Sequence, residues 1–185
     1  MAKVALRPVV DADSVQLLAW RNSPDVRAFM YTDHVIAPDE HARWFAAAVA
    51  DPTRRYWIIE ADGAGVGLAN LYDIGTPDGS ATWAFYLADP AVRGKGAGAM
   101  TEYLVIEEVF GPLGLQRLWC EVLETNPAVI KLHKRFGFVE EARLAERAVK
   151  DGAAVDAIGL ALSRERWADV RPAMVERLAG MGFEL

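Results

Sequence analysis

Residues 81–99 read ATWAFYLADPAVRGKGAGA, and this stretch decides the fold of the chain. Its first half is rich in aromatic and apolar side chains, which favours a β-strand. Pro90 ends that strand, because proline has no N–H to donate to a ladder. From Ala97 onward the apolar residues recur with helical spacing. The stretch therefore predicts a strand, a glycine-rich turn and a helix, in that order.

A turn of this kind is suited to bind a phosphate group. Its glycines let the backbone approach an anion closely, and the first N–H groups of the following helix have no partner within the helix. Arg93 and Lys95 add positive charge to the turn in a chain that is acidic as a whole. We therefore expect an anion-binding site at residues 93–98.

Composition limits the class of protein. The chain has 185 residues, of which 52% are hydrophobic, so we expect one domain with a full core. A net charge of −6 argues against nucleic acid or an anionic membrane as the main partner. The single cysteine, Cys120, rules out an internal disulfide and a cysteine-rich metal site, and we expect no metal. The sequence shows neither a signal peptide nor a membrane span, which predicts a cytoplasmic protein.

The remaining pattern predicts one mixed α/β domain, residues 1–185, with a C-terminal helical extension at 163–185. Strands are expected at 4–10, 56–60, 66–72, 81–88, 118–123, 139–149 and 153–162. Helices are expected from 11 or 13 to 22, then at 24–30, 38–50, 97–110, 127–136 and from 163 onward.

The glycines alone leave alternatives open. A dinucleotide-binding loop is one, with Glu121 holding a ribose just over twenty residues further on. That motif requires its third glycine one position later and a βαβ unit around it, whereas this loop follows antiparallel strands. A purely structural turn is another alternative.

A second motif, NPAVIKLHKRFGF at residues 126–138, begins at the end of a predicted strand. Together with the RGKGAG of residues 93–98, it resembles the two signature motifs of the Gcn5-related N-acetyltransferase (GNAT) family. The resemblance covers nearly the whole chain, because the order of elements matches, as does the closing hairpin that runs into Trp167. It implies a single-domain α/β fold with a mixed, mostly antiparallel sheet that is splayed between two central strands and carries helices on both faces.

The resemblance also implies that acetyl-coenzyme A is the co-substrate. The glycine loop would hold its pyrophosphate, and Asn126 would bond the pantetheine arm or cap its own helix. In the family the strand before the loop splays from its neighbour at a bulge, pairs with the pantetheine near residues 86–88 and polarises the thioester oxygen with one N–H. Lys131, Lys134 and Arg135 could meet the adenosine phosphates or form a solvated basic face. The implied coenzyme-binding residues are Leu87, Ala88, Arg93, Gly94, Lys95, Gly96, Ala97, Gly98, Asn126 and Lys134.

Acetyl transfer to an amine needs two more groups, one to take a proton from the amine and one to give a proton to the leaving thiolate. Glu121 is the candidate base, acting through water; a surface carboxylate at a strand end is the alternative. His133 stands where many family members have a tyrosine that is thought to protonate the thiolate. A histidine with an ordinary pKa is mostly neutral at pH 7, so a plain helix-surface histidine is the alternative.

The acceptor is indicated by residues 20–22 and by the segments 24–31 and 40–45. They resemble the subgroup of UDP-4-amino-4,6-dideoxy-N-acetyl-β-L-altrosamine N-acetyltransferases, which act in pseudaminic acid-type (nonulosonate) biosynthesis for flagellin modification. The resemblance implies acetylation of the 4-amino group of a UDP-linked amino sugar. A slot formed by Met30, Tyr31, Phe45 and Tyr86 would suit a flat uracil by stacking. The alternative is that these residues are simply part of the core, and this alternative is favoured for Phe45.

Two other functions stay open at this point. The first is acetylation of a protein N-terminus, of the ribosomal-protein type, or of a polyamine. The second is a non-catalytic module that only binds acyl-coenzyme A. The expected partner is a small-molecule substrate, the nucleotide-linked amino sugar, and the chain is expected to be a monomer or a homodimer.

Overall fold

Seven strands form one mixed sheet in the computed structural model, which describes residues 3–185. Their order across the sheet is β1-β2-β3-β4-β5-β7-β6. The strands are β1 (Val4–Pro8), β2 (Arg55–Ala61), β3 (Ala64–Tyr72), β4 (Ser80–Leu87), β5 (Arg117–Leu123), β6 (Val139–Lys150) and β7 (Ala153–Ser163). The α-helices are α1 (Ser14–Asn22), α2 (Pro24–Arg27), α3 (Pro38–Ala50), α4 (Ala97–Phe110), α5 (Pro127–Arg135) and α6 (Arg164–Gly180), and two short 3₁₀ helices are η1 (Asp11–Asp13) and η2 (Pro90–Val92).

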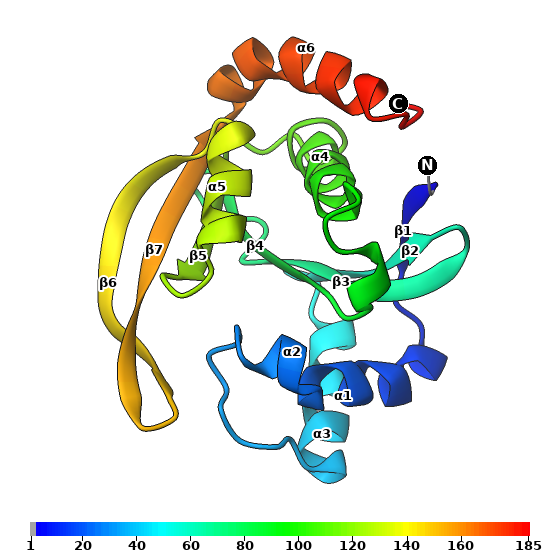
Figure 1. Cartoon of the computed structure of the whole chain (residues 1–185), viewed down its shortest axis with the longest axis vertical. Helices are drawn as coiled ribbons and strands as arrows, with labels where there is room; N and C mark the ends of the chain where they lie inside the picture. The colour runs from blue at the N-terminus through cyan, green and yellow to red at the C-terminus, as the bar shows by residue number, and fades with distance from the viewer. Residues whose placement is uncertain (1–2) are drawn as a thin grey trace.

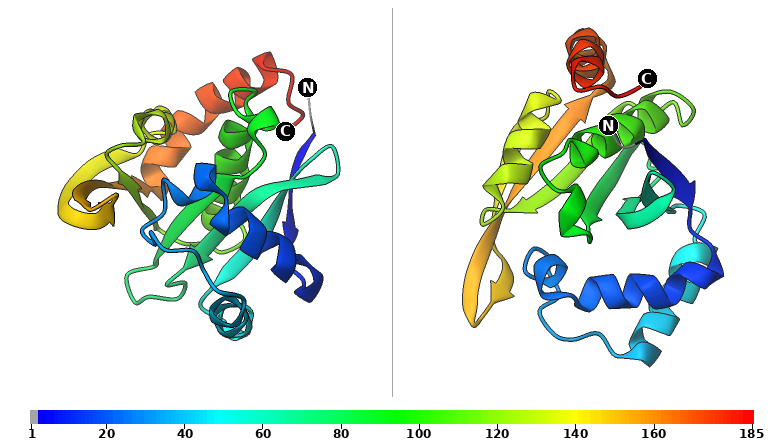
Figure 2. Two further views of the ribbon diagram at one scale, coloured as in Figure 1. Left: turned by 60° about the horizontal axis from the view of Figure 1, so that its bottom comes forward. Right: turned by 45° about the vertical axis from the view of Figure 1, so that its right-hand side comes forward.

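Helices cover both faces of the sheet, as Figures 1 and 2 show. Helices α1, α2 and α3 lie on one side, and α4, α5 and α6 lie on the other. Successive side chains of β2 point to opposite faces of the sheet, so this strand contributes to the core on both sides. Trp57 and Ile59 pack in the large core beneath α4. Ile58 between them packs with Leu17 of α1 and Phe45 of α3 in a smaller cluster. The predicted α/β architecture with helices on both faces is confirmed.

The sheet is split at its centre, between β4 and β5. These two strands are the one parallel pair of the sheet in residues 3–185, and they pair only from Ser80–Thr82 to Arg117–Trp119. Beyond that point β5 pairs with β7 along its whole length, while β4 stays with β3. The two halves therefore diverge, and the predicted splay between central strands is confirmed.

The irregularity that was expected at the splay lies at the very end of β4. The pairing of β3 with β4 keeps its register as far as Leu87. Just beyond, the amides of Ala88 and Asp89 both donate to the carbonyl oxygen of Val66, at 2.8 and 3.2 Å. Two residues of one strand thus face one residue of the other, as in a β-bulge.

Helix α2 is shorter than the sequence pattern predicts. It ends at Arg27, and Phe29 and Met30 continue in tight turns in place of a further helical turn. Lys150 of β6 donates to the carbonyl oxygens of Arg27 and Thr32, at 3.0 and 3.2 Å. These contacts cap the end of the helix from a distant part of the chain, so the boundary could not be read locally. No helix within residues 3–185 is long and apolar enough to cross a lipid bilayer.

Candidate active site

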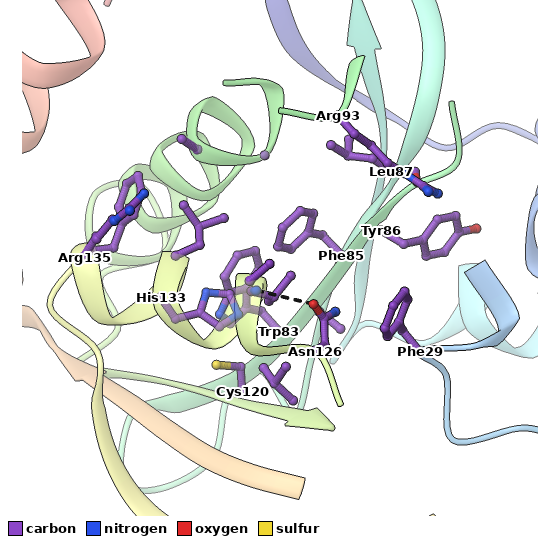
Figure 3. A pocket seen from close by; sticks show the side chains of 18 of the residues that line it. Phe29, Trp83, Phe85, Tyr86, Leu87, Arg93, Cys120, Asn126, His133 and Arg135 are labelled. Carbon is purple, nitrogen blue, oxygen red and sulfur yellow. Dashed lines mark hydrogen bonds between the residues drawn. The ribbon is translucent and has the colours of Figure 1, made fainter. Parts of the chain in front are cut away.

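A cavity of about 700 Å³ runs through the split in the sheet. Figure 3 shows Arg135 at one end and Phe29 and Tyr86 at the other, with His133 and Cys120 between them. The walls come from α2 and the loop after it, from β4 and β5, from the glycine loop, and from α5 and α6. One continuous space therefore joins the two ends at which the sequence predicts the coenzyme and the acceptor.

The exposed edge of β4 supplies backbone groups to this cavity. Because Ala88 donates its N–H to Val66 of β3, the alternation of an antiparallel strand turns the amides of Phe85 and Leu87 toward the split. The carbonyl oxygen of Leu87 accepts hydrogen bonds from Arg93, from Nε at 3.2 Å and from Nη2 at 2.8 Å. Leu87 lines the cavity, whereas the amide of Ala88 is already used and its predicted part in the coenzyme site is not supported.

The glycine loop has the conformation that its sequence predicts. Gly94 and Gly96 have positive φ angles of 73° and 89°, which side chains strongly disfavour. Gly96 directly precedes α4, so the first amides of the helix, at residues 97–99, lie beyond the reach of any intrahelical acceptor. Arg93, Gly94, Gly96 and Gly98 line the cavity.

Two of the glycine-loop residues that were predicted to bind the coenzyme, Lys95 and Ala97, do not line the cavity. Ala97 is 4% exposed and packs into the core, because it begins the buried face of α4. Lys95 has an exposed side chain away from the cavity wall. Lys134 likewise lies outside the cavity, and its ammonium group is 2.7 Å from the carboxylate of Glu140. Its neighbour Arg135 lines the cavity in its place.

The position of Asn126 is compatible with both of the roles that the sequence predicts, helix cap and contact with the coenzyme. It precedes α5, and its side-chain oxygen accepts a hydrogen bond of 3.4 Å from the amide of Val129, which is the geometry of a helix cap. It also lines the cavity beside the split between β4 and β5. The cap is therefore observed, and contact with a pantetheine arm is compatible with it.

The acceptor end of the cavity is apolar and aromatic. Phe29, Met30 and Tyr31 line it from the loop after α2, and Tyr86 lines it from β4. The hydroxyl of Tyr86 is buried and has no hydrogen-bond partner among residues 3–185. The predicted role of Phe45 in this end is wrong: Phe45 does not line the cavity, and its ring packs with Leu17 and Ile58 in the smaller core cluster.

Glu121 lies at this end with a network of its own. Its Oε2 accepts hydrogen bonds from the hydroxyl of Tyr31 at 2.6 Å and from Nε of Arg147 at 2.8 Å. Partial burial by itself raises the pKa of Glu121, but these hydrogen bonds outweigh it and hold the pKa below its usual range. The carboxylate is therefore ionised at neutral pH. The guanidinium of Arg147 also covers one face of the Tyr31 ring, 5.3 Å from its centroid.

Arg147 was missed by reasoning from the sequence, and no local signal marks it. It lies in β6 where the pairing with β7 shifts register between Leu144 and Ala148. Glu146 beside it has a positive φ of 50° without a glycine to announce the irregularity. Only the bulged strand in three dimensions brings Arg147 to Glu121.

His133 is buried, with 2% of its surface exposed, so the alternative of a surface histidine is wrong. Its Nδ1 lies 2.9 Å from Oε1 of Glu102 on α4. The rings of Trp83, Phe85 and Phe138 surround the imidazole. Glu102 was not anticipated, although α4 is apolar on nearly all sides, which is a signal that a carboxylate within it would be buried.

Comparison with known proteins agrees with this geometry. Residues 3–139 match the acetyltransferase (GNAT) domain family. The chain is 27% identical over 130 residues to Acetyltransferase PseH of Campylobacter jejuni, covering 70% of this chain and 79% of that protein. It is 23% identical over 164 residues to a spermidine N(1)-acetyltransferase of Escherichia coli, covering 89% of this chain and 88% of that protein.

The solved structures give the same fold. The spermidine N-acetyltransferase of Vibrio cholerae, in complex with CoA and spermine, superposes with a TM-score of 0.83 at 21% identity. The match covers 90% of this chain and 98% of that one. The family match covers most of the chain. The structure of this chain combines a split sheet, a glycine loop at the start of α4 and a cavity that both of them line. The chain belongs to the GNAT family and is an acyl-CoA-dependent N-acetyltransferase.

Proposed function

We propose that this enzyme transfers an acetyl group from acetyl-coenzyme A to the 4-amino group of a UDP-linked amino sugar, in a pathway of the pseudaminic acid type. The observation that carries the acceptor part is the apolar, aromatic end of the cavity, which is joined directly to an ionised carboxylate. The likeness to Acetyltransferase PseH supports the same reading as the sequence motifs.

The coenzyme enters on the side of the glycine loop. The amides at the start of α4 and the φ angles of Gly94 and Gly96 suit a pyrophosphate. The unpaired edge of β4, at Phe85 and Leu87, suits the pantetheine arm, and Asn126 faces it across the split. An amide of this edge can also polarise the thioester carbonyl.

The acceptor ammonium must lose two protons to become an amide nitrogen, and the departing thiolate must gain one. The acceptor ammonium gives its proton to Glu121, directly or through water, and the resulting amine attacks the thioester carbon. The new C–N bond forms, the attacking nitrogen loses its second proton to solvent, and the bond between the carbon and sulfur breaks. The departing thiolate then takes a proton from His133. The low pKa of Glu121 keeps the carboxylate available for the first step at neutral pH.

The sugar nucleotide would lie at the acceptor end. The uracil stacks among Phe29, Met30 and the face of Tyr31 that Arg147 leaves open. Arg147 lies beside this end of the cavity, where its guanidinium pairs with Glu121 at 2.8 Å.

A polyamine is the second candidate acceptor, because spermidine acetyltransferases match this chain over most of its length. Two carboxylates at this end of the cavity, Asp25 and Glu121, could attract a cation. Each already faces an arginine, however: Asp25 is 3.2 Å from Arg93, and Glu121 is 2.8 Å from Arg147. A polyamine would have to displace these pairs, which weighs against it.

The decisive measurement compares kcat/KM for the UDP-linked 4-amino sugar, the same amino sugar without UDP, spermidine and a short peptide. We expect the UDP-linked sugar to be preferred by a wide margin. Equal efficiency with and without UDP, or activity only on spermidine or peptides, would overturn the proposed acceptor.

Tyr31 gives a sharper test of the stacking. Loss of a base–aromatic stack costs on the order of 1–3 kcal/mol, so Tyr31→Ala should raise the KM for the UDP-linked sugar about tenfold. The KM for acetyl-coenzyme A should stay the same, because the coenzyme lies at the other end of the cavity. Tyr31→Phe is the matched control: it keeps the ring and removes only the hydroxyl that bonds Glu121, so it should leave the KM for the sugar nearly unchanged.

A further inference from the structure

Glu102 and His133 form a buried pair of ionisable groups beside the cavity. The side chain of Glu102 is 0% exposed and that of His133 is 3% exposed. Nδ1 of the imidazole lies 2.9 Å from Oε1 of the carboxylate, across the packed interface of α4 and α5. Burying two such groups is unfavourable unless each stabilises the other, so this pair needs a reason.

The side chains around the pair are mostly aromatic, so the carboxylate and the imidazole stabilise each other's charge. Trp83 and Phe85 of β4 and Phe138 after α5 pack around the imidazole with aromatic rings. Cys120 of β5 is the other titratable group that faces it, and it too lines the cavity. Within residues 3–185, the second oxygen of Glu102 has no hydrogen-bond partner, so no further group shares its charge.

This arrangement fixes the protonation of the imidazole. Burial alone would lower the pKa of His133, but the charge of Glu102, together with Cys120, outweighs it and raises the pKa to about 10. Because the pKa is raised above its ordinary value, the imidazole keeps its proton as the pH rises through 7 and 8. With Nδ1 engaged by Glu102, Nε2 is the ring nitrogen left to interact with Cys120 and with a ligand in the cavity.

We propose that Glu102 is a positioning residue that holds His133 as an imidazolium. A histidine can then protonate the departing coenzyme A thiolate in a position where many family members have a tyrosine. The proposal rests on the proposed acetyl transfer for its kinetic part. The Nε2–H bond breaks as the S–H bond of coenzyme A forms, which leaves a neutral imidazole bound to the carboxylate. The acceptor nitrogen gives up two protons in forming the amide. One of them replaces the proton that the pair lost, and the other is released to solvent in each turnover.

Nuclear magnetic resonance tests the charge without any substrate. The chain has three histidines, so ¹⁵N-labelled histidine gives a spectrum that His133→Ala can assign. His34 is exposed, and the buried His41 faces the backbone oxygen of Ser14 at 2.8 Å without a carboxylate, so it is the internal control. We expect the His133 nitrogens to report imidazolium up to at least pH 8.5. A neutral His133 at pH 7 would overturn the proposal.

Glu102→Gln removes the charge and keeps the shape. In this variant we expect His133 to lose its proton at a much lower pH than in the wild type, because the charge of Glu102 no longer opposes burial. The value of kcat should fall at least tenfold at pH 8.5 and little at pH 5.5, with the KM for acetyl-coenzyme A nearly unchanged. The matched control is Glu107→Gln, on the same helix, because Glu107 pairs with Arg171 outside the cavity. An unaltered pH profile for Glu102→Gln would refute the proposal.

Combining Glu102→Gln with His133→Tyr distinguishes two roles of Glu102: holding the proton on His133, and supporting the packing of the fold. His133→Tyr supplies a hydroxyl that carries its own proton to about pH 10. Glu102→Gln should therefore cost that variant less than twofold in kcat at pH 8.5. A loss as large as in the wild-type background would mean that Glu102 acts only through the fold. If no amine is acetylated at all, the proposed function fails, while the resonance measurement still decides the charge of His133.

Discussion

Gly96 and Gly98 lie two residues apart, yet the structure gives them different tasks. A Cβ on Gly96 would approach Met181 to 2.6 Å and Phe183 to 2.8 Å, and its φ of 89° disfavours any side chain. A Cβ on Gly98 would meet only Phe85 and Leu132, at 3.6 and 3.7 Å, which is ordinary contact. Gly96 is therefore needed by the fold, whereas Gly98 keeps space open in the cavity.

This difference selects the better probe of coenzyme binding. Gly98→Val should fold and should weaken acetyl-coenzyme A binding at least tenfold, or about 1.4 kcal/mol, because a branched side chain enters the channel. Gly96→Val should lower the melting temperature instead, by forcing the C-terminal residues away. Calorimetric titration and thermal melts distinguish the two, and unchanged affinity in a folded Gly98→Val would remove the loop from the site.

At the scale of an element, α6 contributes more than a covering layer. Trp167, Met174 and Leu178 bury one side of the helix in the main core, although Pro172 interrupts its hydrogen bonding. Arg177 on the same helix lines the cavity together with Arg135 of α5. Within residues 3–185, neither arginine takes part in an ion pair. They form two unmatched positive charges at the coenzyme end of a cavity in an acidic protein.

We expect these charges to meet the 3′-phosphate of coenzyme A. Arg177→Ala should weaken coenzyme A binding about fivefold, the effect of about 1 kcal/mol from a solvent-accessible ion pair. Binding of 3′-dephospho-coenzyme A should not change, because the phosphate is missing. Arg171→Ala serves as the control, since Arg171 pairs with Glu107 outside the cavity. Equal losses for both ligands would contradict this assignment.

At the scale of the whole molecule, the cavity runs between two half-sheets. Strands β1 to β4 form one half and strands β5, β7 and β6 the other, and the halves share only the short pairing of Ser80–Thr82 with Arg117–Trp119. A ligand in the split contacts both halves and binds the folded state alone. Binding should therefore stabilise the protein as one unit.

Thermal melts measure this effect directly. At a coenzyme A concentration of about 100 times its Kd, the free energy of unfolding should rise by about 2.7 kcal/mol. For a chain of this size, that corresponds to an increase in Tm of about 5–10 °C. Gly98→Val should show a much smaller increase at the same concentration. If coenzyme A leaves the Tm of the wild-type protein unchanged, the split does not hold it.

The sequence by itself determined the order and nature of the elements, because their signals are local. Glycines with positive φ, prolines at helix starts and alternating apolar residues act within a few residues of the chain. Gly94 and Gly96 sit in the loop where their spacing predicts them, and Asn126 caps α5 as its motif indicates. The boundary of α2 was misjudged, because Lys150 caps it from a strand far along the chain.

The tertiary structure alone decided which side chains meet. Phe45 and Met30 lie in similar apolar patterns of the sequence. Phe45 is nevertheless buried in a core cluster, because α3 packs on the sheet, whereas Met30 lines the cavity. Arg147 reaches Glu121 only because β6 is bulged. The charge of His133 depends on Glu102, thirty-one residues away and on another helix. A pKa is set by the burial and charges around a group, and these exist only once distant segments have packed together.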